Sequence, residues 1–441
     1  MSLRTLLVLT FPIFLSACLP DDGSSETVEE QQNEASLSMC YMKDSTNSSI
    51  EGDASMSRRY TLASVSKVIT SMWAIERLGL YHRYSTRIYI TPVGNNAFDM
   101  HLEGSRDPIM GQKAAYFIVS QLNQLGYDTG KIETLSFDEN FLFEWRLEQV
   151  DRIKGNTEFF KNRNDQIASV ARNLRAGFAS LDYSQFRQLQ KEANEDGIRL
   201  NDISRIDARR VEFKPKAQFF KTAQTRTFVY HSSPLHRILK NMNNSSNNYI
   251  ADHIYWNLGS SPEFKKYIKS SMGFGPETIQ FHLGSGNNAN YIDGNSNNIY
   301  NTATCPAIIK SMLKVESLLK SERLRLTDIL PVAKTDTPST LEDYVGLFDH
   351  AMVAKTGTVN KAKTLAGAVS TASGKIYFAA LYEAKDKEDA DLAVGPIKEK
   401  VLELIRNNGG PVKLNYHKLN PLPFDRESAL TEEFALDQGL R

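Results

Sequence analysis

The segment from Tyr60 to Leu80 places the strongest constraint on the fold, because it predicts a helix with a wide buried face. Apolar residues recur in it at intervals of three and four, at Val65, Val68, Ile69, Met72, Trp73 and Ile75. Ser64 stands where this helix should begin, and Lys67 follows three residues later on the same face. The positive end of a helix dipole and the free amides of its first turn favour developing negative charge. The pair therefore predicts a serine nucleophile beside an amine.

The S-x-x-K pattern is not specific by itself. It occurs again at Ser311–Lys314 and at Ser317–Lys320, both within the amphipathic helix expected over Ile308–Leu319. Taken alone, Ser64 would more simply be a helix cap. A catalytic interpretation therefore depends on further motifs downstream.

Length and composition set the broad class. At 441 residues and 49.6 kDa, the chain exceeds a single typical core, so we expect two compact units, with one enlarged domain as the alternative. The 41% hydrophobic and 24% charged residues are ordinary for a globular protein. Because 52 basic residues balance 52 acidic ones, the strongly basic character of a nucleic-acid binder is missing.

The N-terminus predicts export. Arg4 precedes an apolar run over Leu6–Leu15, which is too short to span a bilayer and is typical of a secretory signal. The run ends in Leu-Ser-Ala-Cys18, which resembles a bacterial lipoprotein processing site with Cys18 as the lipidated residue; an ordinary signal peptide is the alternative. Leu19 rather than Asp follows the cysteine, so we expect a periplasmic protein held at the outer rather than the inner membrane.

Two cysteines, Cys40 and Cys305, remain in the mature chain. They could form a disulfide in an oxidising periplasm, but the sequence does not give their separation, so both states stay open. The eight histidines show no spacing of the H-E-x-x-H kind. We therefore expect no metal and no other cofactor.

The pattern along the chain divides it into segments. Residues 1–18 are the signal segment, and the polar, acidic residues 19–35 predict a flexible tether. Residues 36–90 and 225–410 alternate strand and helix patterns, whereas 91–224 are an insertion that includes the charged helices expected at Asp165–Phe178 and Tyr183–Glu195. Residues 411–441 have no clear period and are expected to form an extended tail.

A second motif lies in a strand near the C-terminus. Lys355-Thr356-Gly357-Thr358 contains the only K-T-G in the chain, within the strand pattern of 351–359. Strand patterns at 364–369 and 375–382, joined by the turn at 370–374, follow it. An amine and a hydroxyl on such a strand can hold a carboxylate, and Gly357 would let another backbone approach closely. A lysine and a threonine on a solvated strand face are the structural alternative.

A third motif, Ser246-Asn247-Asn248, stands at a junction between a loop and a helix. S-x-N is a weak signal, since Ser45, Ser285 and Ser296 each begin one and Ser245 offers a competing register.

In the order S-x-x-K, S-x-N, K-T-G, the three motifs resemble those of the penicillin-recognising serine enzymes. Ser246 comes 182 positions after Ser64, so a module must be inserted between them. This spacing is similar to that of the class C low-molecular-mass penicillin-binding proteins, the D-alanyl-D-alanine carboxypeptidase/endopeptidase family of penicillin-binding protein four. Several segments fall in the family's order: Leu102–Pro108, His231–Pro234, Gly284–Gly286 and Leu330–Ala333. The resemblance covers about residues 36–407.

The resemblance implies an α/β (α+β) fold of the transpeptidase and β-lactamase type, with an antiparallel sheet flanked by helices. It implies that Ser64 attacks a D-alanyl peptide bond and forms an acyl-enzyme, with Lys67 as the base. Lys67 must be neutral for this step, and burial beside the second cation Lys355 favours the neutral amine. The substrates would be stem peptides and cross-links of peptidoglycan, with β-lactams as covalent inhibitors.

The remaining roles follow from the same resemblance. The backbone amides of Ser64 and Thr358 would hold the oxyanion. Ser246 would pass the proton to the departing amine, and Asn248 would bind the acyl side chain. Lys355 and Thr356 would recognise the substrate carboxylate. The sequence identifies no protein partner.

The sequence departs from the family pattern in two places, and two alternative functions remain open. The insertion is shorter than usual, which predicts an open cleft and therefore D,D-endopeptidase activity at least comparable to D,D-carboxypeptidase activity. The Asn-rich segment 287–301 also departs from the family. A β-lactamase of the same fold and an inactive wall-binding lipoprotein are the alternative functions.

Overall fold

A computed structural model describes residues 36–44, 48–94, 96–147, 163–179, 182–203, 206–290, 297–346, 348–418 and 420–433. The expected signal segment and tether lie outside these ranges, so the interpretations of residues 1–35 stay predictions. Within the described ranges, no helix combines the length and the apolar character needed to cross a membrane.

One part of the protein is built on a five-stranded antiparallel sheet with the strand order β11-β12-β13-β1-β2. Its strands are β1 (Ser36–Lys43), β2 (Glu51–Gly52), β11 (Met352–Val359), β12 (Ala362–Thr371) and β13 (Gly374–Glu383). The predicted hairpin is confirmed, because Thr371 pairs with Gly374 across a two-residue turn. Both faces are buried: Leu365 packs in the cluster that contains α12, whereas Ala366 packs in the cluster that contains α1.

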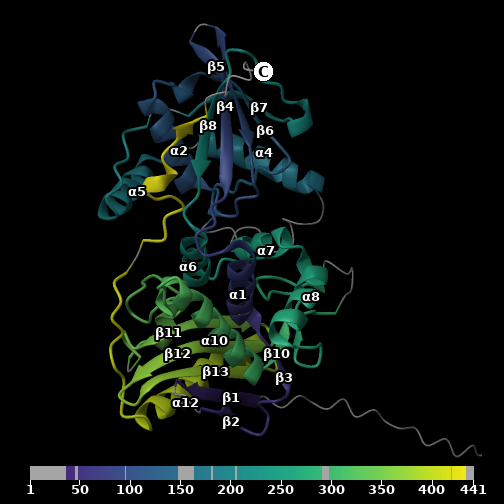
Figure 1. Cartoon of the computed structure of the whole chain (residues 1–441), viewed down its shortest axis with the longest axis vertical. Coiled ribbons are helices and arrows are strands. Elements are labelled where there is room, and N and C mark those ends of the chain that lie inside the picture. Colours follow the sequence, from purple (N-terminus) through teal and green to yellow (C-terminus); the bar gives the residue numbers. More distant parts are fainter. Residues whose placement is uncertain are drawn as a thin grey trace, which may run out of the picture. The chain divides into compact units, whose positions relative to one another are not determined.

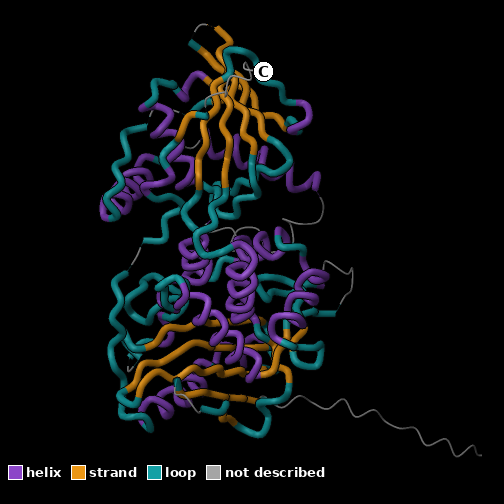
Figure 2. The backbone as a smooth tube through the Cα atoms, in the orientation of Figure 1, coloured by secondary structure: helices purple, strands orange, loops and turns teal. Residues whose placement is uncertain are grey.

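The helices of the structure lie between and around the sheets, as Figures 1 and 2 show. They are α1 (Ser66–Leu78), α2 (Gln112–Gln124), α4 (Arg163–Ala179), α5 (Tyr183–Glu195), α6 (Leu235–Ser245), α7 (Asn248–Asn257), α8 (Ser260–Met272), α10 (Cys305–Ser321), α11 (Lys387–Leu392) and α12 (Val394–Arg406). Every residue of α1 from Ser66 to Ile75 is buried. The predicted buried face therefore extends around the whole first part of this helix, which is typical of a central helix.

A second, six-stranded sheet has the order β14-β8-β4-β5-β6-β7. Its strands are β4 (Ser85–Gly94), β5 (Ala97–Glu103), β6 (Ile132–Phe137), β7 (Ala208–Phe213), β8 (Arg226–His231) and β14 (Thr431–Glu432). The pairs β5–β6 and β6–β7 are parallel, and the others are antiparallel. Apolar residues of the strands and of α2, α4 and α5 share one core cluster. A small three-stranded sheet, β3 (Arg59–Thr61), β10 (Thr302–Thr304) and β9 (Ile279–Gln280), lies beside α1.

The expected segment boundaries at 90 and 225 differ from those of the sheets. The boundary at 90 cuts through β4, and both β4 and β8 belong to the six-stranded sheet. The reason is packing, because Ile88, Ile90 and Phe228 bury their side chains in the core cluster of α2. We call residues 36–84 and 232–411 the five-stranded region, and residues 85–231 with β14 the six-stranded region.

The C-terminal strap, residues 412–433, follows an extended path from β12 to β8 (yellow in Figure 1). Near its start, the amide of Val412 donates to the carbonyl of Ser370 at 2.8 Å. Farther on, Asp425 accepts two hydrogen bonds from the Arg83 guanidinium at 2.9 and 2.7 Å. The segment ends as β14, paired with β8. The expected tail is therefore an extended segment that contacts both regions.

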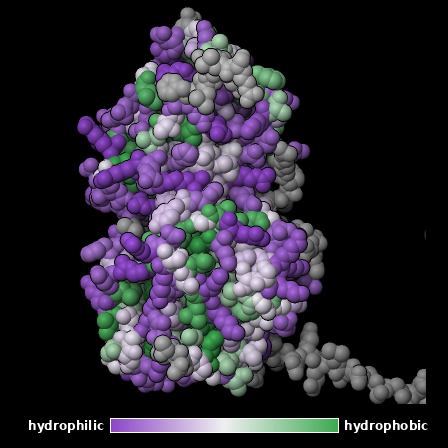
Figure 3. All heavy atoms as spheres, in the orientation of Figure 1, coloured by the Kyte–Doolittle hydropathy of each residue, from purple (hydrophilic) through white to green (hydrophobic). Residues whose placement is uncertain are grey.

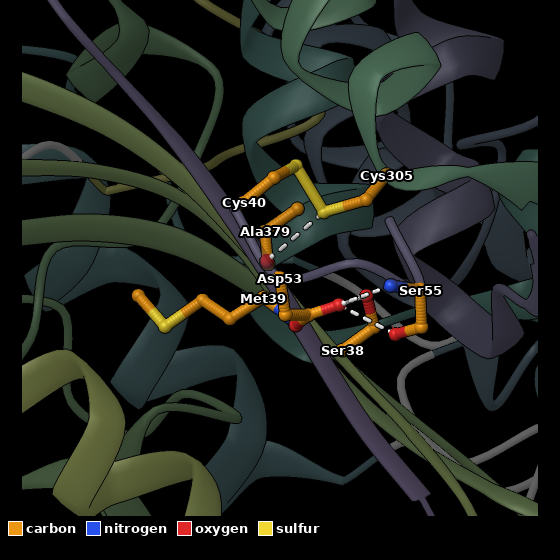
Figure 4. The surroundings of a disulfide bond; sticks show 7 residues. All are labelled: Ser38, Met39, Cys40, Asp53, Ser55, Cys305 and Ala379. Carbon is orange, nitrogen blue, oxygen red and sulfur yellow. Dashed lines mark hydrogen bonds between the residues drawn. A yellow bond between two sulfur atoms is a disulfide. The ribbon is translucent and has the colours of Figure 1, made fainter. Parts of the chain in front are cut away.

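A disulfide joins Cys40 on β1 to Cys305, the first residue of α10 (Figure 4). The two Cα atoms are 6.0 Å apart although 265 positions separate them in the sequence. The structure thereby settles the pairing that the sequence left open. The link holds α10 against the five-stranded sheet.

Candidate active site

Ser64 lies at the start of the central helix, within the 3-10 turn η1 (Ala63–Val65) that leads into α1. The helix itself begins at Ser66, two residues later than the sequence predicted. The turn is tight, because Ala63 adopts a φ of 46° and the Val65 amide donates to the Leu62 carbonyl at 3.1 Å. A non-glycine residue in this conformation is uncommon and often marks a functional turn. The turn leaves the Ser64 side chain half-buried.

The Lys67 ammonium joins the first two motifs. Its Nζ donates to Ser64 Oγ at 2.9 Å and to Asn248 Oδ1 at 2.6 Å. A third bond runs to the Ser285 carbonyl at 3.2 Å, and the Lys67 side chain is fully buried. An amine this close to a hydroxyl can exchange a proton with it.

The structure resolves which S-x-N register faces this amine. Ser246 ends α6 with a φ of 57°, and its half-buried side chain lies in the turn before α7. Asn247 Oδ1 caps α7 by accepting from the Ile250 amide at 2.9 Å, which leaves Asn248 to contact Lys67. In the competing register, Ser245 Oγ donates back to the carbonyl of Asn241 at 3.0 Å. Asn248 is thus the member of the motif that contacts the site, and Ser246 lies two residues before it, in the turn between α6 and α7.

Lys355 brings a second buried amine to the site. Its side chain is fully buried in β11, and Nζ donates to the Thr356 carbonyl at 2.7 Å. Desolvation, followed by the charge of Lys67, holds the pKa of Lys355 well below its usual value. Burial and the like charge of Lys67 therefore both lower the pKa of the Lys355 amine.

The K-T-G strand lies directly against the turn that carries Ser64. A Cβ at Gly357 would lie 2.8 Å from the Ser64 nitrogen and 2.9 Å from the Leu62 carbonyl oxygen, so only glycine fits without a shift. Thr364 Oγ1 from the neighbouring strand donates to the same Leu62 carbonyl at 2.8 Å. Thr356 is buried and Thr358 is exposed. Because β11 is the terminal strand of its sheet, it can present backbone groups to a ligand.

A loop that the sequence analysis noted without assigning a role forms another wall. The Ser285 carbonyl accepts from Lys67, and its amide and Oγ donate to the buried carboxylate of Asp252 at 2.6 and 2.9 Å. Gly286 has a φ of 76°, and a Cβ there would lie 1.9 Å from the Ala63 carbonyl oxygen. The Gly-Ser-Gly sequence was the available signal, since glycines on both sides of a serine permit this close approach.

Asn301 was missed because it lies in the Asn-rich segment that the sequence predicts as loop. Its side chain is fully buried and makes four hydrogen bonds. Nδ2 donates to Ser66 Oγ at 3.0 Å and to the Leu283 carbonyl at 2.6 Å. Its backbone carbonyl accepts from the Leu62 amide at 2.9 Å. Asn301 therefore ties the Ser64 turn to the segment before Gly284.

The two other S-x-x-K matches have ordinary structural contacts. Ser311 is buried in α10, where Oγ donates to the Ala307 carbonyl at 2.8 Å. Ser317 is exposed. The corresponding amines form ion pairs: Lys314 with Glu76 at 3.1 Å and Lys320 with Glu316 at 3.3 Å. In the part of the chain that the structure describes, no group of three or more His, Cys, Asp or Glu side chains could hold a metal ion.

Comparisons with known proteins agree with this geometry. Residues 186–400 match the D-Ala-D-Ala carboxypeptidase 3 (S13) family. A comparison with curated protein sequences found no match.

Several solved structures are similar. The predatory peptidoglycan endopeptidase Bd3459 from Bdellovibrio bacteriovorus is 41% identical, with 91% of this chain and 100% of that chain covered at a TM-score of 0.85. A further structure of Bd3459 is acylated by penicillin G and complexed with the immunity protein Bd3460; it is 40% identical over 91% of this chain and all of the other, with a TM-score of 0.81. The predatory endopeptidase Bd0816 from the same organism, also in complex with Bd3460, is 39% identical over 90% and 100% of the two chains, with a TM-score of 0.85.

A more distant structure supports the fold alone. Penicillin-binding protein 4 from Haemophilus influenzae is 17% identical over 85% of this chain and 97% of that chain, with a TM-score of 0.54. The predicted fold class, with an antiparallel sheet flanked by helices, is confirmed.

Proposed function

Because this chain belongs to the D-Ala-D-Ala carboxypeptidase 3 (S13) family, we propose that it is a serine D,D-peptidase of peptidoglycan that works through an acyl-enzyme on Ser64. The observation that carries the proposal is the buried Lys67 amine, which bonds at once to Ser64 Oγ, Asn248 Oδ1 and the Ser285 carbonyl. No structural role requires an amine at the centre of these three contacts. Its placement is that of a base next to its nucleophile.

In the acylation step, neutral Lys67 takes the proton of Ser64 while Oγ attacks the carbonyl carbon of a D-alanyl residue. The backbone amides of Ser64 and Thr358 stabilise the negative oxygen, since they need no reorganisation to do so. The C–N bond then breaks, and Ser246 passes the proton from Lys67 to the departing amine. Water attacks the ester and releases the product.

Substrate recognition uses the edge of β11. The stem peptide lies along this strand, with Lys355 and Thr356 facing its carboxylate end and Asn248 binding the acyl side. Gly357 keeps the strand close to the Ser64 nitrogen, and we propose that the amides of Ser64 and Thr358 donate to the same oxyanion. A β-lactam enters the same site and acylates Ser64, in the way that penicillin G acylates the 40% identical Bd3459.

The preferred bond is the cross-link between two stems. The chain spans the whole of the 41% identical endopeptidase Bd3459, and its insertion is shortened relative to penicillin-binding protein four as the sequence indicates. An open cleft admits the second strand of a cross-link. We therefore expect D,D-endopeptidase activity on dimers at least comparable to D,D-carboxypeptidase activity on pentapeptides.

Digestion of purified muropeptides tests both the D,D-peptidase assignment and the preference for cross-links. Mass analysis should show cross-linked dimers converted to monomers at a rate at least equal to D-alanine release from pentapeptide monomers. Efficient trimming with intact dimers would overturn the endopeptidase preference. Failure to cleave either substrate would overturn the D,D-peptidase assignment, and rapid multiple turnover of penicillin would favour a β-lactamase instead.

We also propose that the protein is a periplasmic lipoprotein held at the outer membrane through Cys18. The apolar run before Cys18 and the polar residues 19–35 after it support this placement. Cys18→Ala should move the protein from the membrane pellet into the soluble periplasmic fraction with its activity in vitro retained. Continued sedimentation of the variant with membranes would contradict the anchor.

A further inference from the structure

A cavity of about 970 Å³ lies apart from the residues of the catalytic site. It is bounded by α2, α5, the segment before Leu147, one residue of α6 and one of the C-terminal strap. Ile109, Leu147 and Leu189 form a buried apolar floor. The volume falls at the upper end of the range for pockets that bind small ligands. A disaccharide with its substituents is of this size class.

The rim of the cavity is polar, and two of its acidic groups already have hydrogen-bond or ion-pair partners. Lys113 on α2 pairs with Glu192 on α5 at 3.0 Å. The Asp182 carboxylate is occupied by the amides of Ser184 and Gln185 at 2.9 and 3.2 Å. Because these charges already have partners, the rim does not favour a highly charged ligand. On the face drawn in Figure 3, the surface around α5 is mainly hydrophilic.

Carboxamides supply much of the remaining rim chemistry. They belong to Gln112, Gln185, Gln188 and Asn241. A carboxamide both donates and accepts hydrogen bonds without a net charge. Such groups match hydroxyl and acetamido substituents, which also donate and accept while staying neutral.

Two further side chains, Tyr183 and Arg146, indicate which class of ligand the cavity can bind. Tyr183 lines the cavity with 58% of its surface exposed, and an exposed aromatic ring offers a flat apolar face that can stack on the C–H face of a pyranose. Arg146 is also exposed on the lining and can bind a single carboxylate. A sugar with acetamido groups, linked to one acidic peptide, combines all of these features.

The cavity is joined to the catalytic site by a short series of contacts. Asn247 Nδ2 donates to the carbonyl of Leu147, on the cavity floor, at 2.9 Å. Asn247 stands between Ser246 and Asn248, and Asn248 contacts the Lys67 amine that bonds to Ser64. Four residues of extended peptide span about 13–14 Å, which is the reach that a stem peptide has from a sugar in the cavity toward Ser64.

We propose that this cavity binds the glycan part of the substrate, the N-acetylglucosamine–N-acetylmuramic acid disaccharide whose stem peptide enters the catalytic site. The inference rests on the proposed peptidoglycan activity and adds a subsite to it. The enzyme then recognises a cross-link as part of a glycan strand, and the sugar contributes binding energy to cleavage of the peptide.

Paired substrates test this subsite. One is a purified cross-linked dimer that carries its disaccharides, and the other is the same dimer after an amidase has removed them. The wild-type enzyme should cleave the glycan-bearing dimer with a kcat/KM about tenfold higher, as expected for one good contact surface. In Tyr183→Ala and Gln188→Ala this ratio should fall toward one. Phe220→Ala is the matched control, because Phe220 is an exposed aromatic residue of the six-stranded region that does not line the cavity, and it should keep the wild-type ratio.

A ratio near one in the wild type, or a ratio unchanged in Tyr183→Ala, would overturn the glycan subsite while cleavage itself still supports the D,D-peptidase. If neither dimer is cleaved, the proposed D,D-peptidase function is overturned. In that case, a measurement of disaccharide binding tests the cavity independently of cleavage. Calorimetric titration with the disaccharide free of peptide should show saturable binding to the wild type and at least tenfold weaker binding to Tyr183→Ala. Absence of binding to the wild type would overturn the subsite as well.

Discussion

The two regions of the protein differ in the buried lysines that they contain. The lysines that are buried in the described part of the chain, Lys67, Lys240, Lys355 and Lys363, all lie in the five-stranded region. In the six-stranded region, α2 packs against the C-terminal strap, where Phe117 stacks on the fully buried Phe424 with ring centroids 4.3 Å apart. Buried amines cost desolvation energy, whereas stacked rings stabilise the fold. The buried lysines therefore cost the five-stranded region stability, and two of them, Lys67 and Lys355, belong to the candidate active site.

The largest effect on activity should come from Ser64→Ala. Without its nucleophilic oxygen the enzyme cannot form the acyl-enzyme, so dimer cleavage and labelling by a fluorescent penicillin should fall by at least about 10³-fold. Ser311→Ala is the matched control, because Ser311 belongs to another S-x-x-K match but donates its Oγ to the Ala307 carbonyl within α10. Labelling retained in Ser64→Ala, or lost in the control, would contradict the assignment.

Lys355→Met should lower the activity of the enzyme and raise its stability. We expect cleavage to fall by about 10²–10³-fold, since the carboxylate of the substrate loses the amine that donates to it. The variant should nevertheless be more stable than the wild type near pH 7, because it removes a buried amine.

The pH dependence of this stability difference has a definite sign. The pKa of Lys355 is lowered on folding, so between its folded and unfolded values the unfolded chain holds a proton that the native protein has released. Wild-type stability attributable to this group therefore rises with pH through that window, which ends near 10.5. Melting temperatures of both proteins from pH 7 to about pH 10 should show the advantage of the variant shrinking. An advantage that stays constant or grows would disprove this account of Lys355.

Asn301→Ala should have an intermediate effect on both activity and stability. It leaves the amides of His282 and Leu283 without their side-chain acceptor, at about 1–3 kcal/mol for each buried group that stays unpaired. Because Asn301 also holds Ser66, the rate of penicillin acylation should fall by about 10–100-fold. The control is Asn298→Ala, an exposed residue of the same segment, and an equal loss of acylation in both variants would argue against a positioning role.

The smallest effect on catalysis should follow a large change in the packing of the C-terminal strap on the six-stranded region. Phe424 is fully buried against Phe117, so Phe424→Ala should lower the free energy of unfolding by about 3–5 kcal/mol. At a temperature where the variant stays folded, its rate of penicillin acylation should lie within about twofold of the wild type, since additivity holds for distant sites. A loss of acylation comparable to that of Asn301→Ala would show that this packing also affects the candidate active site.

The sequence predicted best what depends on neighbouring residues. The helix at 183–195 and the hairpin before Lys375 both follow from short patterns, and the structure confirms them. The three catalytic motifs are also local, and the fold brings Ser64, Lys67, Asn248, Lys355 and Gly357 together.

Features that depend on distant residues could not be predicted in this way. The parallel pairing of β7 with β6 and the addition of β14 to β8 bring together segments that share no pattern. The role of Asn301 depends on packing across 235 positions to Ser66, and one asparagine in an Asn-rich loop cannot be told from the next by composition. The disulfide depended likewise on a separation that only the fold provides.

Peptide mapping after exposure to penicillin G tests the central claim most directly. Trypsin should release the peptide Tyr60–Lys67, which contains both Ser64 and Ser66. Fragmentation of this peptide locates the penicilloyl group on one of the two hydroxyls. We predict a single adduct on Ser64 in the wild type and an unmodified peptide in Ser64→Ala, whereas an adduct on Ser66, on a serine elsewhere in the chain, or on none would contradict the account.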